Sequence, residues 1–164
     1  MTMADMEDFS RFFEDLSKTE MIIDKASDEV GEYLVRTIKA RVRLGFGVAN
    51  DGDRKDKFKE LAESTIKHRQ WLSRVGLLYP GSKPGRSHLT ATGQMMDSLI
   101  YKKEPGYVIL SFSNQEAENK AYYNDRGGRV TRPFFRMTDL EIKATERTLQ
   151  KALDEYIDGI AQTL

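Results

Sequence analysis

Few residues of this chain are of a type that performs chemistry. Cysteine is absent, which excludes disulfides, thiol nucleophiles and cysteine-ligated zinc. The two histidines, His68 and His88, have no partner at HxxxH or HxH spacing, so neither predicts a metal site. Ser87 precedes His88 directly, but no GxSxG motif supports a serine hydrolase. We therefore predict no catalytic residue, no metal and no cofactor.

The loop from Gly81 to Ser87 has a faint likeness to a phosphate-binding loop. Its glycine spacing is one residue short, Arg86 stands where that motif has lysine, and Pro84 removes a backbone donor. The chain has 26 acidic residues, and most fall on predicted helix faces beside Lys or Arg, where solvated ion pairs are the ordinary interpretation. Neither feature predicts nucleotide binding or hydrolysis.

The charges are balanced overall and divided unevenly along the chain. There are 26 basic and 26 acidic residues, yet residues 1–35 hold ten acids against three bases and residues 36–89 hold five against thirteen. Two arrangements would neutralise this segregation. The acidic front folds onto the basic middle, or the two face neighbouring copies in a ring. Solvated helix faces with ordinary clumping of like charges account for the segregation equally well, and the sequence leaves all three interpretations open.

Basic residues gather between positions 54 and 75, where His68 and Trp71 accompany them. A helix that contacts nucleic-acid phosphates has this composition, and so does a solvated helix in a protein complex. Because the net charge is zero, we keep a nucleic-acid-binding module that uses this helix as an alternative function only. The basic residues are Arg54, Lys55, Lys57, Lys59, Lys67, Arg69 and Arg74.

Apolar spacing predicts the helices that must position these residues. We expect two amphipathic helices, Met6–Lys18 and about Thr19–Leu44, and a third over about Arg54–Val75. A short helix follows from about Thr92 to Ser98, and the last runs from Asp139, its expected N-cap, to about Ile160. The last helix has a predicted core face formed by Leu140, Ala144, Thr148, Leu149, Ala152, Tyr156, Ile157 and Ile160.

Alternating β-forming residues predict a hairpin between Leu99–Lys103 and Tyr107–Ser113. A Pro- and Gly-rich stretch from Gly76 to Ser87 predicts an exposed loop. This order predicts an α+β fold in which long helices pack against a small antiparallel β-sheet and a C-terminal helix ends the chain. We expect one domain over residues 1–164, and no apolar run approaches the ~20 residues of a membrane span.

A series of short motifs follows the basic region in a specific order. Phe58–Lys67 corresponds to LSxxTIxxK, and Leu89–Leu99 to LxxTGxLxxSI. After the hairpin, Tyr122–Gly128 corresponds to YAxxHxxGG, and Arg132–Phe135 to RPFL before the last helix. This ordered set resembles the tail-completion family of tailed phages, also called virion morphogenesis or head–tail joining proteins. The resemblance covers about residues 58–160, a family-like core, and leaves the N-terminal helical region of residues 1–50 uncovered.

The chain also departs from the family pattern. Met95 and Met96 stand where the family has leucine or arginine, and a packing site tolerates methionine because it is an adaptable filler. Asn124 and Asp125 lie near the family's histidine, and the loop from Gly76 to Ser87 is longer. These differences affect the subfamily more than the fold.

The resemblance implies a structural virion protein and not an enzyme. A tail-completion or neck protein forms a ring, here expected to be a homo-hexamer matched to the tail's sixfold symmetry, that joins the end of the tail tube to the head connector. Its expected partners are the head connector or head-closure protein and the tail tube or tail terminator protein. No membrane and no specific nucleic acid are expected, although DNA passes through such a ring. The expected location is the virion neck or tail, after assembly in the host cytoplasm, and a tail terminator is the alternative within the particle.

We expect contacts between proteins in two loops and in the acidic N-terminal helix, because loops carry recognition. The interface candidates are Tyr79, Lys83, Arg86, Arg126, Gly127, Gly128, Arg129 and Arg132.

The motif residues are expected to be structural. Thr92 and Gly93 start a short helix, with Gly93 permitting the close approach of another backbone, and Leu99 presses into the core. Pro133 fixes the entry angle of the segment, and at least one of Phe134 and Phe135 is buried.

Overall fold

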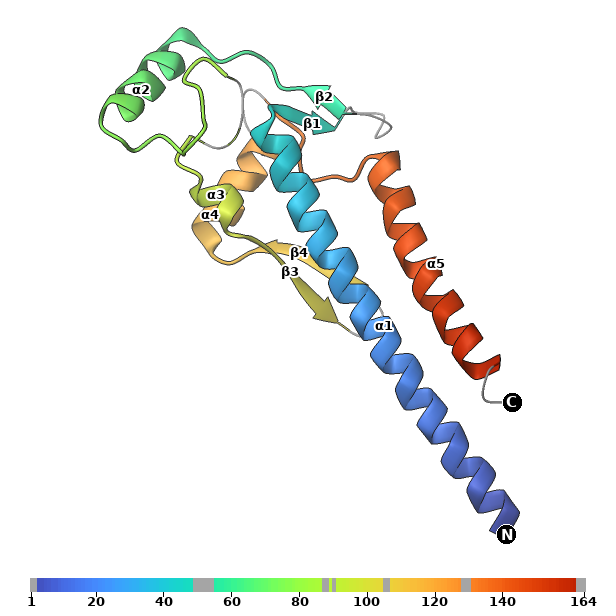
Figure 1. Cartoon of the computed structure of the whole chain (residues 1–164). Coiled ribbons are helices and arrows are strands. Elements are labelled where there is room, and N and C mark those ends of the chain that lie inside the picture. The colour runs from blue at the N-terminus through green and yellow to red at the C-terminus, as the bar shows by residue number, and fades with distance from the viewer. Residues whose placement is uncertain are drawn as a thin grey trace.

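The computed structural model describes residues 3–48, 55–86, 89, 91–104, 107–127 and 131–161. Within these ranges the chain forms five α-helices and two antiparallel two-stranded sheets, as the predicted α+β class requires. Figure 1 shows an elongated molecule in which the long helix α1 (Met3–Arg43) runs past the other elements.

Helix α1 replaces the two helices expected before residue 44. It is continuous over 41 residues. No proline or glycine separates the two predicted segments at Lys18 and Thr19, so the backbone hydrogen bonds continue. Gly45 ends the helix with a φ of +86°, a left-handed conformation that glycine adopts without strain.

The predicted third helix begins later than expected. Lys55–Lys57 forms strand β2, which pairs antiparallel with β1 (Phe46–Val48), and helix α2 covers only Glu63–Arg74. Tertiary contacts of Phe58 explain this later start. Phe58 is buried in the core, and its N–H donates to the carbonyl of Gly45 at 2.9 Å, which holds the chain extended. Arg54, the expected start, lies outside the described residues.

The hairpin prediction is confirmed. Strand β3 (Leu99–Glu104) pairs with β4 (Tyr107–Phe112) in the register Leu99 to Phe112, and α3 (Gln94–Asp97) precedes it. Helix α4 (Gln115–Tyr122) follows without having been predicted. The Asn114 side chain caps it by accepting from the N–H of Ala117 at 2.9 Å. A π-helical turn, η1 (Tyr123–Gly127), ends this stretch.

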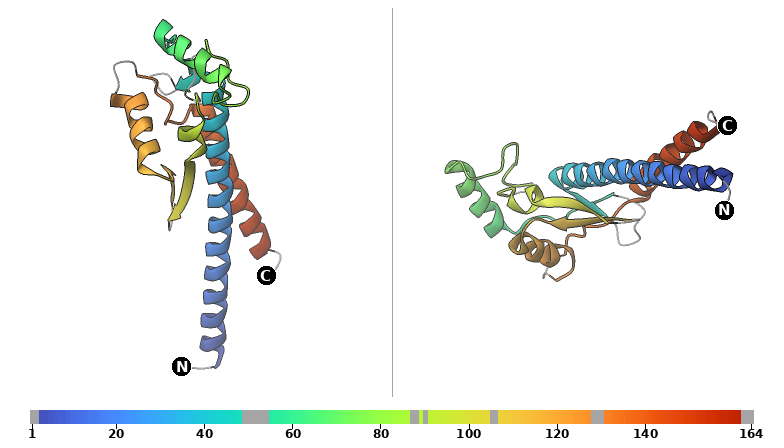
Figure 2. Two further views of the ribbon diagram at one scale, coloured as in Figure 1. Left: turned by 90° about the vertical axis from the view of Figure 1, so that its left-hand side faces the viewer. Right: turned by 90° about the horizontal axis from the view of Figure 1, so that it is seen from below.

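Helix α5 (Asp139–Ala161) confirms the predicted C-terminal helix, although its N-cap is Thr138 and not Asp139. The Glu141 N–H donates to the Thr138 hydroxyl at 3.4 Å, and the Thr138 N–H donates to Glu141 Oε2 at 2.7 Å. This reciprocal pair is a capping box. Figures 1 and 2 show α5 returning beside α1 in the opposite direction.

The apolar core lies where the C-terminal half of α1 meets α3, the hairpin and the segment before α5. Its buried members are Ile38, Val42, Phe58, Met95, Met96, Leu99, Ala121 and Phe134.

The predicted core face of α5 is wrong in part. Ala144, Thr148, Ala152 and Tyr156 are half-buried, but Leu140, Leu149 and Ile157 are exposed, and the Ile160 side chain is not described. Among the described elements α5 packs mainly against α1, which the hairpin also contacts, so α5 buries only a narrow face.

Candidate assembly interface

A buried ion pair joins the two long helices. Arg41 on α1 and Glu141 on α5 have side chains that are 1% and 3% exposed. Both Glu141 carboxylate oxygens accept from Arg41 Nη1, and Arg41 Nη2 donates to the carbonyls of Phe134 and Arg136 at 2.8 Å each. One arginine therefore orders α1, α5 and the segment between η1 and α5.

Asp125 holds the Arg132–Phe135 motif by hydrogen bonds to its backbone. Asp125 is buried, and its Oδ1 accepts from the backbone N–H groups of Phe134 at 2.9 Å and Phe135 at 3.0 Å. Phe134 is fully buried and Phe135 is half-buried against Phe112, with ring centroids 5.5 Å apart. The prediction that at least one ring is buried is confirmed.

Pro133 is half-buried and joins this segment to the first sheet. Its carbonyl accepts from the Val48 N–H at 2.9 Å. The backbone of Gly47 lies so close to that carbonyl that any side chain at position 47 would overlap it.

The Thr92-Gly93 motif starts α3 differently from the prediction. Gly93 itself is the N-cap, in a left-handed conformation with φ of +83°, and no side chain caps the helix. The group that approaches Gly93 is the Tyr79 ring and not another backbone. Thr92 is exposed, whereas Leu99 and the methionines of α3 are buried in the core as expected.

The loop that carries Tyr79, Lys83 and Arg86 is fastened to the end of α1. Tyr79 is half-buried, its hydroxyl accepts from Arg43 Nη2 at 2.6 Å, and the Arg43 guanidinium lies 5.1 Å from its ring centroid. Arg86 is exposed and donates to the carbonyl of Leu44 at 2.9 Å, while Lys83 is exposed. Tyr79 and Arg86 therefore position the loop, and Lys83 projects from it.

Arg69 of α2 helps to hold the loop that carries Arg86. It is buried and donates to the Arg86 carbonyl at 2.8 Å. Burial and, to a smaller extent, the charge of Arg132 lower the Arg69 pKa, and burial also lowers the pKa of the half-buried Arg132.

Arg126 is exposed and lies 3.3 Å from the Asp125 carboxylate. The Gly127 backbone ends η1, and Gly128 and Arg129 lie outside the described residues.

Helix α5 exposes a row of apolar side chains, which we call the α5 stripe: Ile142, Leu149, Leu153 and Ile157. Their exposed fractions are 37%, 41%, 45% and 60%. By helical periodicity the stripe lies roughly a quarter turn away from Thr145, Thr148 and Ala152, which are half-buried on the side toward α1.

A cleft of about 510 Å³ lies between the end of α1 and the segment leading into α2. Phe46, Phe58, Leu61 and Ile66 line its apolar part, and Lys57, Glu60 and Arg86 add charges. The cleft is a gap beside the core, lined mainly by apolar side chains and backbone.

Sequence reasoning missed Arg41, Glu141 and Asp125 as organising residues. Thr138 and Glu141 have capping-box spacing, which is a usable signal for the start of α5. Arg41 lies between Ile38 and Val42 on the apolar stripe of α1, so its position also pointed to burial. Nothing local pairs Arg41 with a residue 100 positions away.

Among the residues that the structure describes, no group of three or more His, Asp or Glu side chains is placed to hold a metal ion. None of the described helices has both the length and the apolar character that a bilayer span requires.

Comparison with protein-family models gives no match, and comparisons with curated proteins and with solved structures give none either.

Proposed function

We propose that this chain is a structural virion protein of a tailed bacteriophage, a tail-completion or neck protein that assembles into a ring and catalyses no reaction. The ring, taken as a hexamer, joins the end of the tail tube to the head connector. The observation that carries the assembly is the α5 stripe, because it leaves a row of large apolar side chains without cover in the single chain.

Burial of the α5 stripe against another protein surface would lower the free energy. Full burial of one leucine or isoleucine side chain stabilises by about 1.5–3 kcal/mol relative to exposure. A row of such side chains along one helix is characteristic of a surface that another protein covers. Because α1 is the main element beside α5 in the part of the chain that the structure describes, a neighbouring copy can reach the stripe.

The motif residues support a structural role. Gly93, Leu99 and Phe134 act through packing, and Asp125 acts through hydrogen bonds to the backbone. Residues that act through packing and backbone hydrogen bonds stabilise the fold, as expected of a structural protein. The assignment to a phage neck, its sixfold symmetry and its partners come from the resemblance in residues 58–160.

The assembly is tested by sedimentation velocity on the double variant Leu153→Ser/Ile157→Ser. We expect the wild-type chain to sediment as a discrete oligomer and the variant as a smaller species with an unchanged circular dichroism spectrum. The matched control is Lys151→Ser/Glu155→Ser, which removes an exposed pair on the same helix. Equal sedimentation of the two variants would argue against the stripe as an interface.

The location is tested by mass spectrometry of purified virions from the phage that encodes the chain. The proposal expects the polypeptide in intact particles at a few copies each, and tailless heads when its gene is disrupted. Particles that lack the polypeptide would refute the virion assignment and leave the assembly itself standing.

A further inference from the structure

The first surface of interest is the N-terminal arm, defined here as residues 3–19 of α1. It contains five acidic and two basic residues, and Phe9, Phe12, Phe13 and Leu16 recur at helical spacing. Figures 1 and 2 show that this part of α1 extends beyond the end of α5 with no other element beside it. The sequence of the arm is thus that of an amphipathic, acidic helix, and its backbone lies apart from the other described elements.

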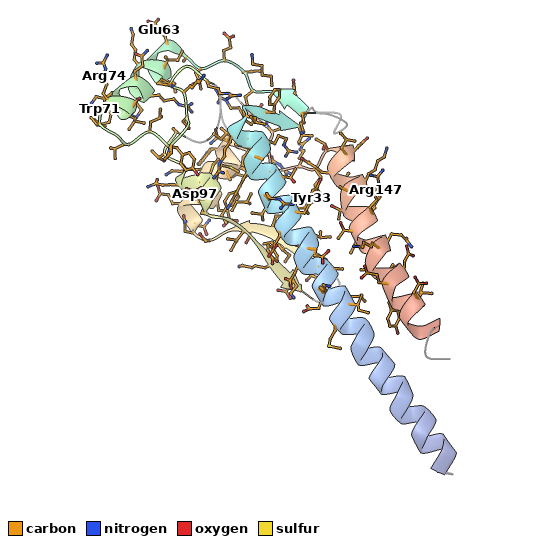
Figure 3. The ribbon with its side chains drawn as sticks, in the orientation of Figure 1. Tyr33, Glu63, Trp71, Arg74, Asp97 and Arg147 are labelled. Carbon is orange, nitrogen blue, oxygen red and sulfur yellow. The ribbon has the colours of Figure 1, made fainter. Side chains whose placement is uncertain are left out.

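The second surface lies on α2 and its C-cap residue Val75 and is called the α2 face: Lys67, His68, Trp71, Arg74 and Val75. Trp71 is 51% exposed and stacks on His68 with ring centroids 5.7 Å apart. Val75 is also exposed, as is Leu77 just beyond the helix. Figure 3 shows Trp71 and Arg74 on the side of α2 that is turned away from the rest of the molecule. An exposed tryptophan flanked by basic groups is suited to a partner that is both apolar and acidic.

These two surfaces cannot meet within one copy. They lie at opposite ends of the molecule in Figures 1 and 2, and the part of α1 between the arm and Arg43 is by itself about 36 Å long at 1.5 Å per residue. Folding the acidic front onto the basic middle, one of the two arrangements that the sequence left open, is thus excluded for these segments. Of the two neutralising arrangements, contact between copies remains, beside helix faces that are simply solvated.

Charge spacing on the two helices matches. Positions 8 and 15 are both aspartate and fall on one side of the arm's apolar row, seven residues apart. Lys67 and Arg74 are also seven residues apart, on one side of Trp71. Two helical turns separate each pair by about 10 Å, so both ion pairs form together when the helices lie side by side.

We infer that the N-terminal arm of one copy docks on the α2 face of a second copy, with its Phe and Leu row against Trp71, Val75 and Leu77. The inference rests on the proposed self-assembly and names one of its contacts. The contact joins the two different ends of the chain, so it is head-to-tail, and such contacts close into rings when the rotation per copy permits. The ion pair of Lys67 with Glu63 on its own helix is no obstacle, because both side chains are more than 70% exposed and such pairs are weak.

Charge reversal tests the contact. The arm variant is Asp8→Lys/Asp15→Lys, the face variant is Lys67→Glu/Arg74→Glu, and a third chain combines all four substitutions. We expect each reversal alone to weaken assembly about tenfold or more at low salt, because like charges then face each other. The combined chain restores assembly, and so does an equimolar mixture of the two single reversals. Reversal of Glu118 and Lys102, exposed groups away from both surfaces, is the matched control and leaves assembly unchanged.

The outcomes separate this inference from the proposed function. A wild-type chain that remains monomeric overturns both. A wild-type oligomer that neither reversal weakens overturns the arm contact alone and leaves the α5 stripe as the interface. Failure of the combined chain and of the mixture to restore assembly also overturns it. So does a face variant that assembles normally but no longer binds a thymidine oligonucleotide, because the α2 face then serves nucleic acid.

Discussion

Arg41 and Glu141 form an ion pair between α1 and α5 that water hardly reaches. The pair joins residues 100 positions apart, and Arg41 also satisfies two carbonyls of the segment that leads into α5. Because Glu141 closes the capping box of the same helix, a single carboxylate fixes both the start of α5 and its attachment to α1.

Replacing one member of this pair should strongly destabilise the fold. Glu141→Gln leaves the Arg41 charge buried without its counter-ion, a change that typically costs about 3–5 kcal/mol. The measurement is the free energy of unfolding in urea. Lys151→Ala, which breaks the exposed pair with Glu155, is the control, and its expected cost is about 0–1 kcal/mol. Equal losses in both variants would contradict the organising role of the buried pair.

Two glycines in the same backbone conformation should respond differently to alanine. Gly93 and Gly81 have φ of +83° and +78°, so each Gly→Ala change carries a left-handed strain of about 1–2 kcal/mol. Only at Gly93 would the new methyl group also overlap the Tyr79 ring, whereas the space around Gly81 is open. We expect Gly93→Ala to lower the melting temperature more, and Tyr79→Ala in the same chain to return part of the loss. The packing account fails if the two single variants melt alike.

Asp125 should matter through the backbone and not through Arg126. Asp125→Ala leaves the N–H groups of Phe134 and Phe135 without their acceptor in the core, at about 1–3 kcal/mol for each donor. Arg126→Ala removes the other contact of that carboxylate, but the Arg126 side chain is 67% exposed, so we expect a loss below about 1 kcal/mol. Denaturant titration of both variants gives the comparison, and a larger loss for Arg126→Ala would reverse the assignment.

The hairpin should depend on pH through Asp28. A hydrogen bond from Lys103, with a smaller contribution from Tyr101, lowers the pKa of Asp28 below its ordinary value of 3.8, and burial opposes this. The folded-state pKa is the lower one, so this stabilisation is complete above the unfolded value and is lost as the pH falls through the folded value. Hydrogen bonds to Asp24 and Asp28 raise the pKa of Lys103, whose contribution is lost instead as the pH rises through its folded value.

Amide chemical shifts of β3 and β4, followed by NMR during an acid titration, measure this dependence. We expect Asp28→Asn to remove the transition assigned to Asp28 while the spectrum at neutral pH retains the hairpin pattern. An unchanged titration curve in the variant would show that another group controls the hairpin.

Local patterns were sufficient for some elements. Alternation on both sides of Pro105-Gly106 predicts β3 and β4, and the apolar spacing after Thr138 predicts α5. Local patterns did not predict the residue at which α2 begins. A helical pattern runs back to Arg54, but burial of Phe58 and its bond to Gly45 hold that stretch in a strand and an extended segment. Tertiary contacts outweigh a propensity of this size.

The sequence predicted the candidate interface only in part, because tertiary contacts also decide which residues are exposed. Periodicity assigned Leu149 and Ile157 to a core face of α5, but both side chains are exposed among the residues that the structure describes. Tyr79 and Arg86 have types and loop positions typical of contact residues, yet both are used to fasten their loop to α1. Exposure is decided by distant neighbours, which short sequence patterns do not report.

Native mass spectrometry of the purified full-length chain tests the account most directly. The account predicts one dominant closed species made of several copies of the 18.8 kDa chain, with six copies expected, at micromolar concentration. A spectrum that contains only the 18.8 kDa monomer over the same concentration range would contradict it.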